Sequence, residues 1–160
     1  AAARLSARSV STTKVSVGAW GSIYLSFCLI LEIMVLVWCA SVLNKLSARF
    51  SKPYRRWQIG LMLVAAIFII LGGHTAQVWI WSSAFVLVGA IGDWNTSVYF
   101  SLATYTTLGY GDVVLGPALR IFAAFAAVTG LFGFGISTAF LVSAMGRLFS
   151  LNGQSYDGKD

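Results

Sequence analysis

The chain has 160 residues, of which 58% are hydrophobic and 10% charged, and its formal net charge is +6. A soluble domain carries roughly a quarter charged residues, so this composition excludes an ordinary soluble protein and indicates an integral membrane protein. The basic residues cluster outside the apolar segments, which is typical of membrane orientation signals. No basic face interleaved with aromatic residues is present, so we expect no nucleic-acid partner.

The N-terminal part of the chain predicts an arm followed by a transmembrane helix. Residues 1–16 are rich in Ala, Ser and Thr, and we interpret them as either a solvated arm or the remnant of a targeting sequence. The apolar segment 17–43 exceeds the roughly 20 residues that cross a bilayer. Trp20 and Trp38 stand near its two ends, where interfacial anchors belong. This helix is the first predicted span.

A basic loop and a second span come next. Residues 44–56 contain five Lys or Arg and no acid, which places this loop on the cytoplasmic side and the N-terminus outside. The apolar segment 57–90 contains Gly72 and Gly73, so it is either one long tilted helix or a helix broken there. The third span, 117–149, has a similar length, and this favours the unbroken helix.

A shorter apolar segment lies between the second and third spans. Residues 94–106 follow plausible helix-capping residues such as Asp93, but they are too few to cross a bilayer. This pattern predicts a re-entrant helix that enters the membrane and leads into the segment 107–111. After the third span, residues 150–160 are polar and predict a disordered tail.

The sequence "TTLGYGD" follows the short helix, at residues 106–112. Non-helical backbone at membrane depth is tolerated only where protein buries it or water lies beside it. Gly109 and Gly111 allow left-handed dihedrals, so a strand of alternating handedness can direct successive carbonyl oxygens toward one axis. Several copies around that axis would form oxygen rings that replace the hydration shell of a cation. The negative C-terminal end of the short helix favours a cation there as well.

The stretch "TYTTLGYGD", residues 104–112, resembles the signature of tetrameric potassium channels, a Thr-Val-Gly-Tyr-Gly run followed by Asp. Leu108 stands where the family usually has Val. The resemblance implies a homotetramer whose outer helix is 57–90, pore helix 94–106, and inner helix 117–149. It also implies a selectivity filter with K⁺ bound at the first four of its five residues, namely Thr107, Leu108, Gly109, Tyr110 and Gly111.

The resemblance extends to residues that support the filter. Thr106 and Asp112 flank it, and Tyr99 and Phe100 fall where the family places an aromatic pair that braces it. Ala103 stands where some members carry a Glu that bonds the Asp after the filter. Because that link cannot form here and Phe100 has no donor, any hydrogen-bonded brace must come from Tyr99.

Two pairs of residues in the spans bear on gating. Gly130 and Gly135 fall where family inner helices carry glycines, and they are either a gating hinge or sites of close helix packing. Glu32 in the first span and His74 in the second are expensive in a membrane unless they interact. We expect them to form either a pH-sensitive pair or a structural hydrogen bond between packed helices.

The sequence therefore predicts an all-α integral membrane protein with three transmembrane helices, a re-entrant pore helix and a filter loop in each subunit of a homotetramer. Its predicted function is passive K⁺ conduction, in a plasma membrane or a bacterial inner membrane, with no enzyme activity and no cofactor. The alternatives are a weakly selective cation channel and a subunit that conducts only with a further partner subunit. A remote alternative is an intramembrane aspartyl protease of the GxGD type, which would need a second catalytic Asp.

Overall fold

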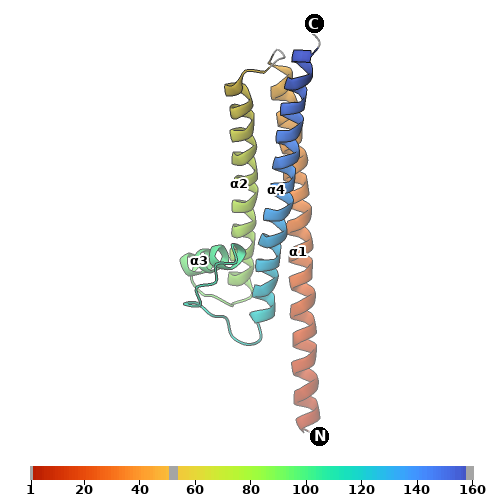
Figure 1. Ribbon diagram of the computed structural model, residues 1–160. Coiled ribbons are helices and arrows are strands. Elements are labelled where there is room, and N and C mark those ends of the chain that lie inside the picture. Colours follow the sequence, from red (N-terminus) through yellow and green to blue (C-terminus); the bar gives the residue numbers. More distant parts are fainter. Residues whose placement is uncertain (1, 51–53, 158–160) are drawn as a thin grey trace. The chain divides into compact units, whose positions relative to one another are not determined.

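The computed structural model describes the backbone of residues 2–50 and 54–157 and the side chains of residues 18–50 and 54–150. Its elements, in chain order, are α1 (Ala2–Ala48), α2 (Arg56–Leu87), α3 (Trp94–Tyr105) and α4 (Arg120–Asp157) (Figure 1). Three of them contain stretches long and apolar enough to cross a membrane: Gly18–Ala48, Arg56–Leu87 and Arg120–Ser150. The predicted all-α membrane architecture with three long apolar helices is therefore confirmed.

The ends of the long helices differ from the predicted boundaries. Helix α1 already begins at Ala2, where we expected an arm, and α4 continues to Asp157, where we expected a disordered tail. Extending an existing helix fixes one residue for each hydrogen bond gained, without the cost of a new nucleus. Polar ends of a long apolar helix can therefore remain helical. At the other end of α4, the helix starts at Arg120, three residues later than the predicted start at Pro117.

Helix α2 ends at Leu87, three residues before the predicted boundary, because the chain forms a glycine C-cap. Gly89 has φ +71°, a conformation that favours glycine. The N–H of Ala90 donates to the carbonyl of Phe85 at 2.9 Å, and that of Gly89 donates to the carbonyl of Val86 at 2.9 Å. A bond that reaches back five residues across a left-handed glycine is the Schellman arrangement that closes a helix.

The described residues form two compact units, and α1, α2 and α4 each contribute to both. One unit comprises the described part of Ala1–Ile30 together with Thr75–Phe132, so it contains α3 and the loop after it. Its core is aromatic, with Phe85 meeting Phe100 edge to face at 5.1 Å and Phe122 at 5.8 Å between ring centroids. The fully buried Trp81 also packs on Phe122, at 5.4 Å.

The other unit comprises Leu31–His74 and the described part of Gly133–Asp160. Its apolar core includes Cys39, Leu43, Tyr54, Ile59, Met62, Ala66 and Leu148. Helix α2 runs through Gly72 and Gly73 without a break. A Cβ on Gly73 would lie 3.0 Å from Cγ1 of Val35 on α1, so this glycine permits close packing of the two helices.

Candidate functional site

Helix α3 begins at a strong N-terminal cap. The carboxylate of Asp93 accepts hydrogen bonds from the backbone N–H of Thr96 at 2.9 Å and from its hydroxyl at 3.0 Å. The first of these bonds is the main reason that the pKa of Asp93 lies below its ordinary value. Because the cap satisfies N–H groups that have no partner within the helix, it defines where α3 starts.

Two buried serines bind α3 to α2. The hydroxyl of Ser97 donates to the carbonyl of Ser82, and that of Ser101 donates to the carbonyl of Val78, both at 2.8 Å. Residues four apart lie on the same face of a helix. From Ser97 to Ser101 the contact moves one turn forward along α3, and from Ser82 to Val78 it moves one turn back along α2. Near the other end of α3, the Tyr105 hydroxyl donates to Oε1 of Gln77 at 3.2 Å. The direction of α3 relative to this part of α2 is therefore defined by three hydrogen bonds.

The backbone after α3 folds back onto the end of the helix. The N–H groups of Leu108 and Gly109 donate to the carbonyl of Ala103 at 2.9 and 3.1 Å, and that of Thr107 donates to the carbonyl of Thr104 at 3.0 Å. Within the described residues, no backbone or side-chain donor is found for the carbonyl oxygens of residues 107–111. The segment thus uses several of its donors internally and leaves a run of acceptors for other groups.

The dihedral angles of this segment alternate in sign. Thr107, Gly109 and Gly111 have φ of +58°, +52° and +81°, whereas Leu108 and Tyr110 do not have positive φ. We predicted left-handed conformations at the two glycines, and these are confirmed. Positive φ at Thr107 was not predicted, because a β-branched residue resists it. Alternating handedness lets successive carbonyl groups point to one side of the strand instead of alternating between sides.

The acidic residue after the segment is held by the short helix. The Tyr99 hydroxyl donates to Oδ2 of Asp112 at 2.6 Å. This bond is the main reason that the pKa of Asp112 is lowered and that the pKa of Tyr99 is raised. Tyr99 is thus placed as the sequence analysis expected of a brace.

Two other residues predicted to support the filter make different contacts. Phe100 is buried in the aromatic core against Phe85, and this contact accounts for its position. Thr106 is the C-cap of α3, and its hydroxyl donates back to the carbonyl of Leu102 at 2.8 Å. Both residues therefore support α3 itself. Within the described residues, neither side chain forms a hydrogen bond with residues 107–112.

The two glycines considered as hinges have different surroundings. A Cβ on Gly130 would overlap the backbone carbonyl oxygen of Tyr105, the last residue of α3. A Cβ on Gly135 would meet nothing within 4 Å. Close packing of α4 against the end of α3 therefore explains why residue 130 is a glycine. No neighbouring atom requires a glycine at position 135.

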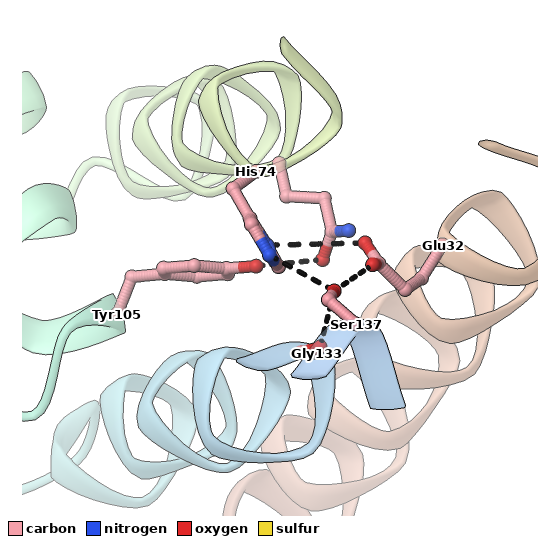
Figure 2. Close-up of polar contacts among 6 residues, drawn as sticks. Glu32, His74, Tyr105, Gly133 and Ser137 are labelled. Atoms are coloured by element: carbon pink, nitrogen blue, oxygen red, sulfur yellow. Dashed lines mark hydrogen bonds and ion pairs between the residues drawn. The ribbon is translucent and has the colours of Figure 1, made fainter. Parts of the chain in front are cut away.

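A second polar group lies inside the other unit, and two of its three members, Glu32 and His74, were predicted to interact. Glu32 and His74 approach each other, with Oε2 of Glu32 3.8 Å from Nδ1 of His74. Ser137 on α4 is the third member and was not foreseen. Its Oγ lies 2.6 Å from Oε1 of Glu32, 3.1 Å from Nε2 of His74 and 2.7 Å from the carbonyl of Gly133 (Figure 2).

Ser137, His74 and Glu32 have the composition of a hydrolytic triad but not its arrangement. In a triad the acid binds the far side of the imidazole, whereas Glu32 also binds the Ser137 hydroxyl directly. The distance of 3.8 Å between Nδ1 and the carboxylate is too long for a hydrogen bond. Ser137 lies inside α4, whose backbone N–H groups are engaged in the helix and cannot form an oxyanion hole. We therefore assign no hydrolytic role to this group.

No curated protein and no solved structure matches the chain. A family model described as "Ion channel" matches residues 59–147, which is more than half of the chain and includes α3, the 106–112 segment and most of α2 and α4. With its three long apolar helices, the chain is a multi-pass membrane protein. It belongs to this ion channel family.

Proposed function

We propose that the chain forms a potassium-selective channel as a homotetramer and that residues 107–111 are its selectivity filter. In this proposal α2 is the outer helix, α3 is a re-entrant pore helix and α4 is the inner helix. Potassium ions cross the membrane passively along the common axis. Backbone oxygens of the filter, together with the Thr107 hydroxyl at its inner end, replace the water around each ion.

The observation that carries this proposal is the geometry of the 107–111 backbone. Positive φ occurs at every second residue, and the amides of Thr107, Leu108 and Gly109 are used by the end of α3. The carbonyl oxygens remain as acceptors for a group that is not a protein donor. A dehydrated cation is such a group, and the C-terminal end of α3 adds a favourable partial negative charge.

The exposure of this segment supports assembly from several copies. Leu108 is 56% exposed and Tyr110 is 71% exposed in the isolated chain. Irregular backbone at membrane depth must be covered by protein or face water, so a single chain is an incomplete site. Cyclic arrangement of identical subunits provides both the cover and the rings of oxygen atoms. The number of four comes from the resemblance to tetrameric potassium channels.

Asp112 and Tyr99 act as support in this proposal. Their hydrogen bond joins the outer end of the filter to the pore helix of the same chain. Since Ala103 provides no carboxyl beside Asp112, the Tyr99 hydroxyl takes the place of the Glu-mediated link that some potassium channels have.

The test is a reversal potential in planar bilayers with purified protein, potassium on one side and sodium on the other. We expect reversal near the potassium equilibrium potential. A current that reverses near zero would instead indicate a weakly selective cation channel, in which Leu108 or the Tyr99 brace leaves the filter loose. Absence of current from reconstituted tetramers would indicate a subunit that needs a partner.

The protease alternative has a separate test. An aspartyl protease needs a second carboxylate beside Asp112, and the side-chain partner of Asp112 is the Tyr99 hydroxyl. We expect Asp112→Asn to change ion conduction while the purified protein cleaves no transmembrane peptide before or after the substitution. Cleavage that disappears in Asp112→Asn would support the protease and overturn the channel.

A further inference from the structure

The Glu32, His74 and Ser137 group joins three helices through a single hydroxyl. Exposure is 0% for Glu32, 6% for His74 and 5% for Ser137, so the group is closed to bulk solvent. Within the spans, Glu32 is the only acid of α1. His74 is the only ionisable residue of α2 after Arg56, which is the first residue of that helix, and α4 contributes none between residues 121 and 146. Protonation of this group is therefore decided by Glu32 and His74 themselves.

The Ser137 hydroxyl makes more contacts than it has protons to donate. A serine hydroxyl has one proton to donate and two lone pairs with which to accept. Ser137 Oγ makes three short contacts, to Glu32, to His74 and to the carbonyl of Gly133. The Gly133 carbonyl can only accept. If Ser137 donates to it at 2.7 Å, the 2.6 Å contact to Glu32 requires a proton on the carboxyl, and the 3.1 Å contact requires a proton on Nε2 of His74.

We propose that Glu32, Ser137 and His74 form a proton-binding site that links the first span to α4. In the bound state the Glu32 carboxylic acid and the neutral His74 imidazole both donate to Ser137 Oγ, and Ser137 donates to the carbonyl of Gly133. Every contact then has one proton, and the hydroxyl uses its full capacity. A neutral group of this kind avoids the cost of placing a charge inside the bilayer.

Release of the proton changes the bonding of α4. The ionised Glu32 carboxylate can only accept, and Ser137 is its hydroxyl donor at 2.6 Å. In this state the 2.6 Å contact takes the single proton of Ser137, which then no longer points to the Gly133 carbonyl. A serine bond to the carbonyl four residues earlier weakens and often bends a helix. The proton thus decides whether α4 carries this bond at Gly133, within the helix proposed to line the pore.

A cavity provides a route for the proton. A hollow of about 200 Å³ is lined by His74, Ser137, Thr138 and the apolar side chains of Ile67, Ile70, Leu71, Phe134 and Leu141. Its volume can hold water, and the His74 imidazole and the Thr138 hydroxyl are polar groups that such water can contact. Glu32 does not line this cavity, so in our proposal its proton reaches water there through Ser137 or His74, which contact both Glu32 and the cavity, and binding is the reverse step.

The proton site can be tested without measuring current. His74 is the only histidine, so imidazole nitrogen resonances in a labelled, purified sample belong to it without assignment. We expect a neutral ring protonated at Nε2 at neutral pH, together with an infrared band from a protonated carboxyl. With five acidic residues in the chain, that band should be resolved, and it should disappear in Glu32→Gln. A doubly protonated His74 without the carboxyl band would overturn the proposal, as would a neutral His74 beside an ionised Glu32.

The coupling to α4 is tested by open probability between about pH 5 and about pH 8, a readout that rests on the proposed function. We expect the wild-type value to change with pH. Glu32→Gln keeps a donor at the carboxyl position and should hold the low-pH value throughout. Ser137→Ala should retain the titrating infrared band but lose the response of the current, because it removes the link and not the proton site.

Ser41→Ala is the matched control for this coupling. Ser41 is exposed on α1 and also donates to the carbonyl four residues earlier, at 3.0 Å to Val37, without an acid beside it. It should keep the wild-type pH response. A pH-independent wild type, or a Ser137→Ala channel that still follows the wild-type curve, would overturn the coupling. The spectroscopic result stands separately, so failure of the channel proposal and failure of the proton site give different results.

Discussion

Two polar regions interrupt this apolar chain, and they are built in opposite ways. Residues 107–111 are consecutive, exposed, and polar through their backbone carbonyls. Glu32, His74 and Ser137 come from three helices, are buried, and are polar through their side chains. The first region presents acceptors without donors, which suits a cation. In the second region an acid and an imidazole meet at one hydroxyl, which suits the binding of a proton.

The two regions therefore depend on different properties, the first on backbone conformation and the second on hydrogen bonds between buried side chains. In the first region the dihedral angles decide which atoms are available, so changes of backbone conformation should have the largest effects. In the second region the hydrogen-bond count decides the state, so exchange of a single proton donor should be enough to alter it.

The largest effect is expected for Gly109→Ala. Its φ of +52° is left-handed, and an alanine held there costs about 1–2 kcal/mol in each subunit, or roughly 4–8 kcal/mol over the four copies of the proposed tetramer. A tenfold change corresponds to about 1.4 kcal/mol, so potassium current should become undetectable. Current is measured in bilayers from equal amounts of folded protein.

Gly116→Ala is the control in the same loop. Gly116 does not have positive φ, and a Cβ there would meet nothing within 4 Å. It should conduct like the wild type. A Gly109→Ala channel with normal selectivity would mean that the alternating dihedrals of residues 107–111 are not required, and the filter assignment would be lost.

Gly130→Ala should reduce stability. The added methyl group would overlap the carbonyl oxygen of Tyr105, and overpacking of this kind costs about 1–3 kcal/mol. The thermal midpoint of the detergent-solubilised protein, followed by size-exclusion chromatography, should fall. Gly135→Ala meets open space and should leave the midpoint unchanged. If Gly135→Ala alters gating at unchanged stability, it acts as a hinge, whereas equal midpoints for Gly130→Ala and wild type would contradict the packing role of Gly130.

Ser101→Ala should have a smaller effect on stability. It removes one buried hydrogen bond to the carbonyl of Val78, and such a bond contributes about 0.5–1.5 kcal/mol. Because this bond orients α3, potassium selectivity should weaken together with the thermal midpoint. Ser83→Ala removes an exposed bond within α2, from Ser83 to the carbonyl of Trp79, and serves as control. A lower midpoint with unchanged selectivity in Ser101→Ala would confine the serine to a structural role.

Features encoded by neighbouring residues could be predicted from the sequence. The three long apolar helices, the cap at Asp93 and the positive φ at Gly109 and Gly111 each depend on local residue types, and the structure has them. Tyr99 was reached through the family resemblance, by elimination of Ala103 and Phe100 as donors.

Features that depend on distant partners could not be predicted. The carbonyls of Val78 and Ser82 that anchor α3 belong to residues whose side chains carry no signal of that role. Ser137 is one of many serines, and a serine in an apolar helix usually bonds only its own helix. Positive φ at Thr107 arises because the chain turns back onto the end of α3, which no property of threonine indicates.

The smallest effect is expected for Tyr99→Phe, which removes only the hydroxyl that binds Asp112. The bond lowers the pKa of Asp112, so its contribution is present above the ordinary Asp pKa and is lost as pH falls through the lowered value. It raises the pKa of Tyr99, so the same contribution is present below the ordinary Tyr pKa and is lost as pH rises through the raised value. Between about pH 4 and about pH 10 the bond is therefore intact, and the difference between wild type and Tyr99→Phe in thermal midpoint should be constant there. Below that range the difference should shrink, because the protonated Asp112 no longer accepts the bond as a carboxylate.

The same substitution should affect current. Potassium current under sustained opening should decline faster in Tyr99→Phe than in the wild type, because the variant lacks the link between the outer end of the proposed filter and α3. Equal rates of decline in the two proteins would show that Asp112 is held by other contacts in the assembled channel, and the exposed region would then depend on its backbone alone.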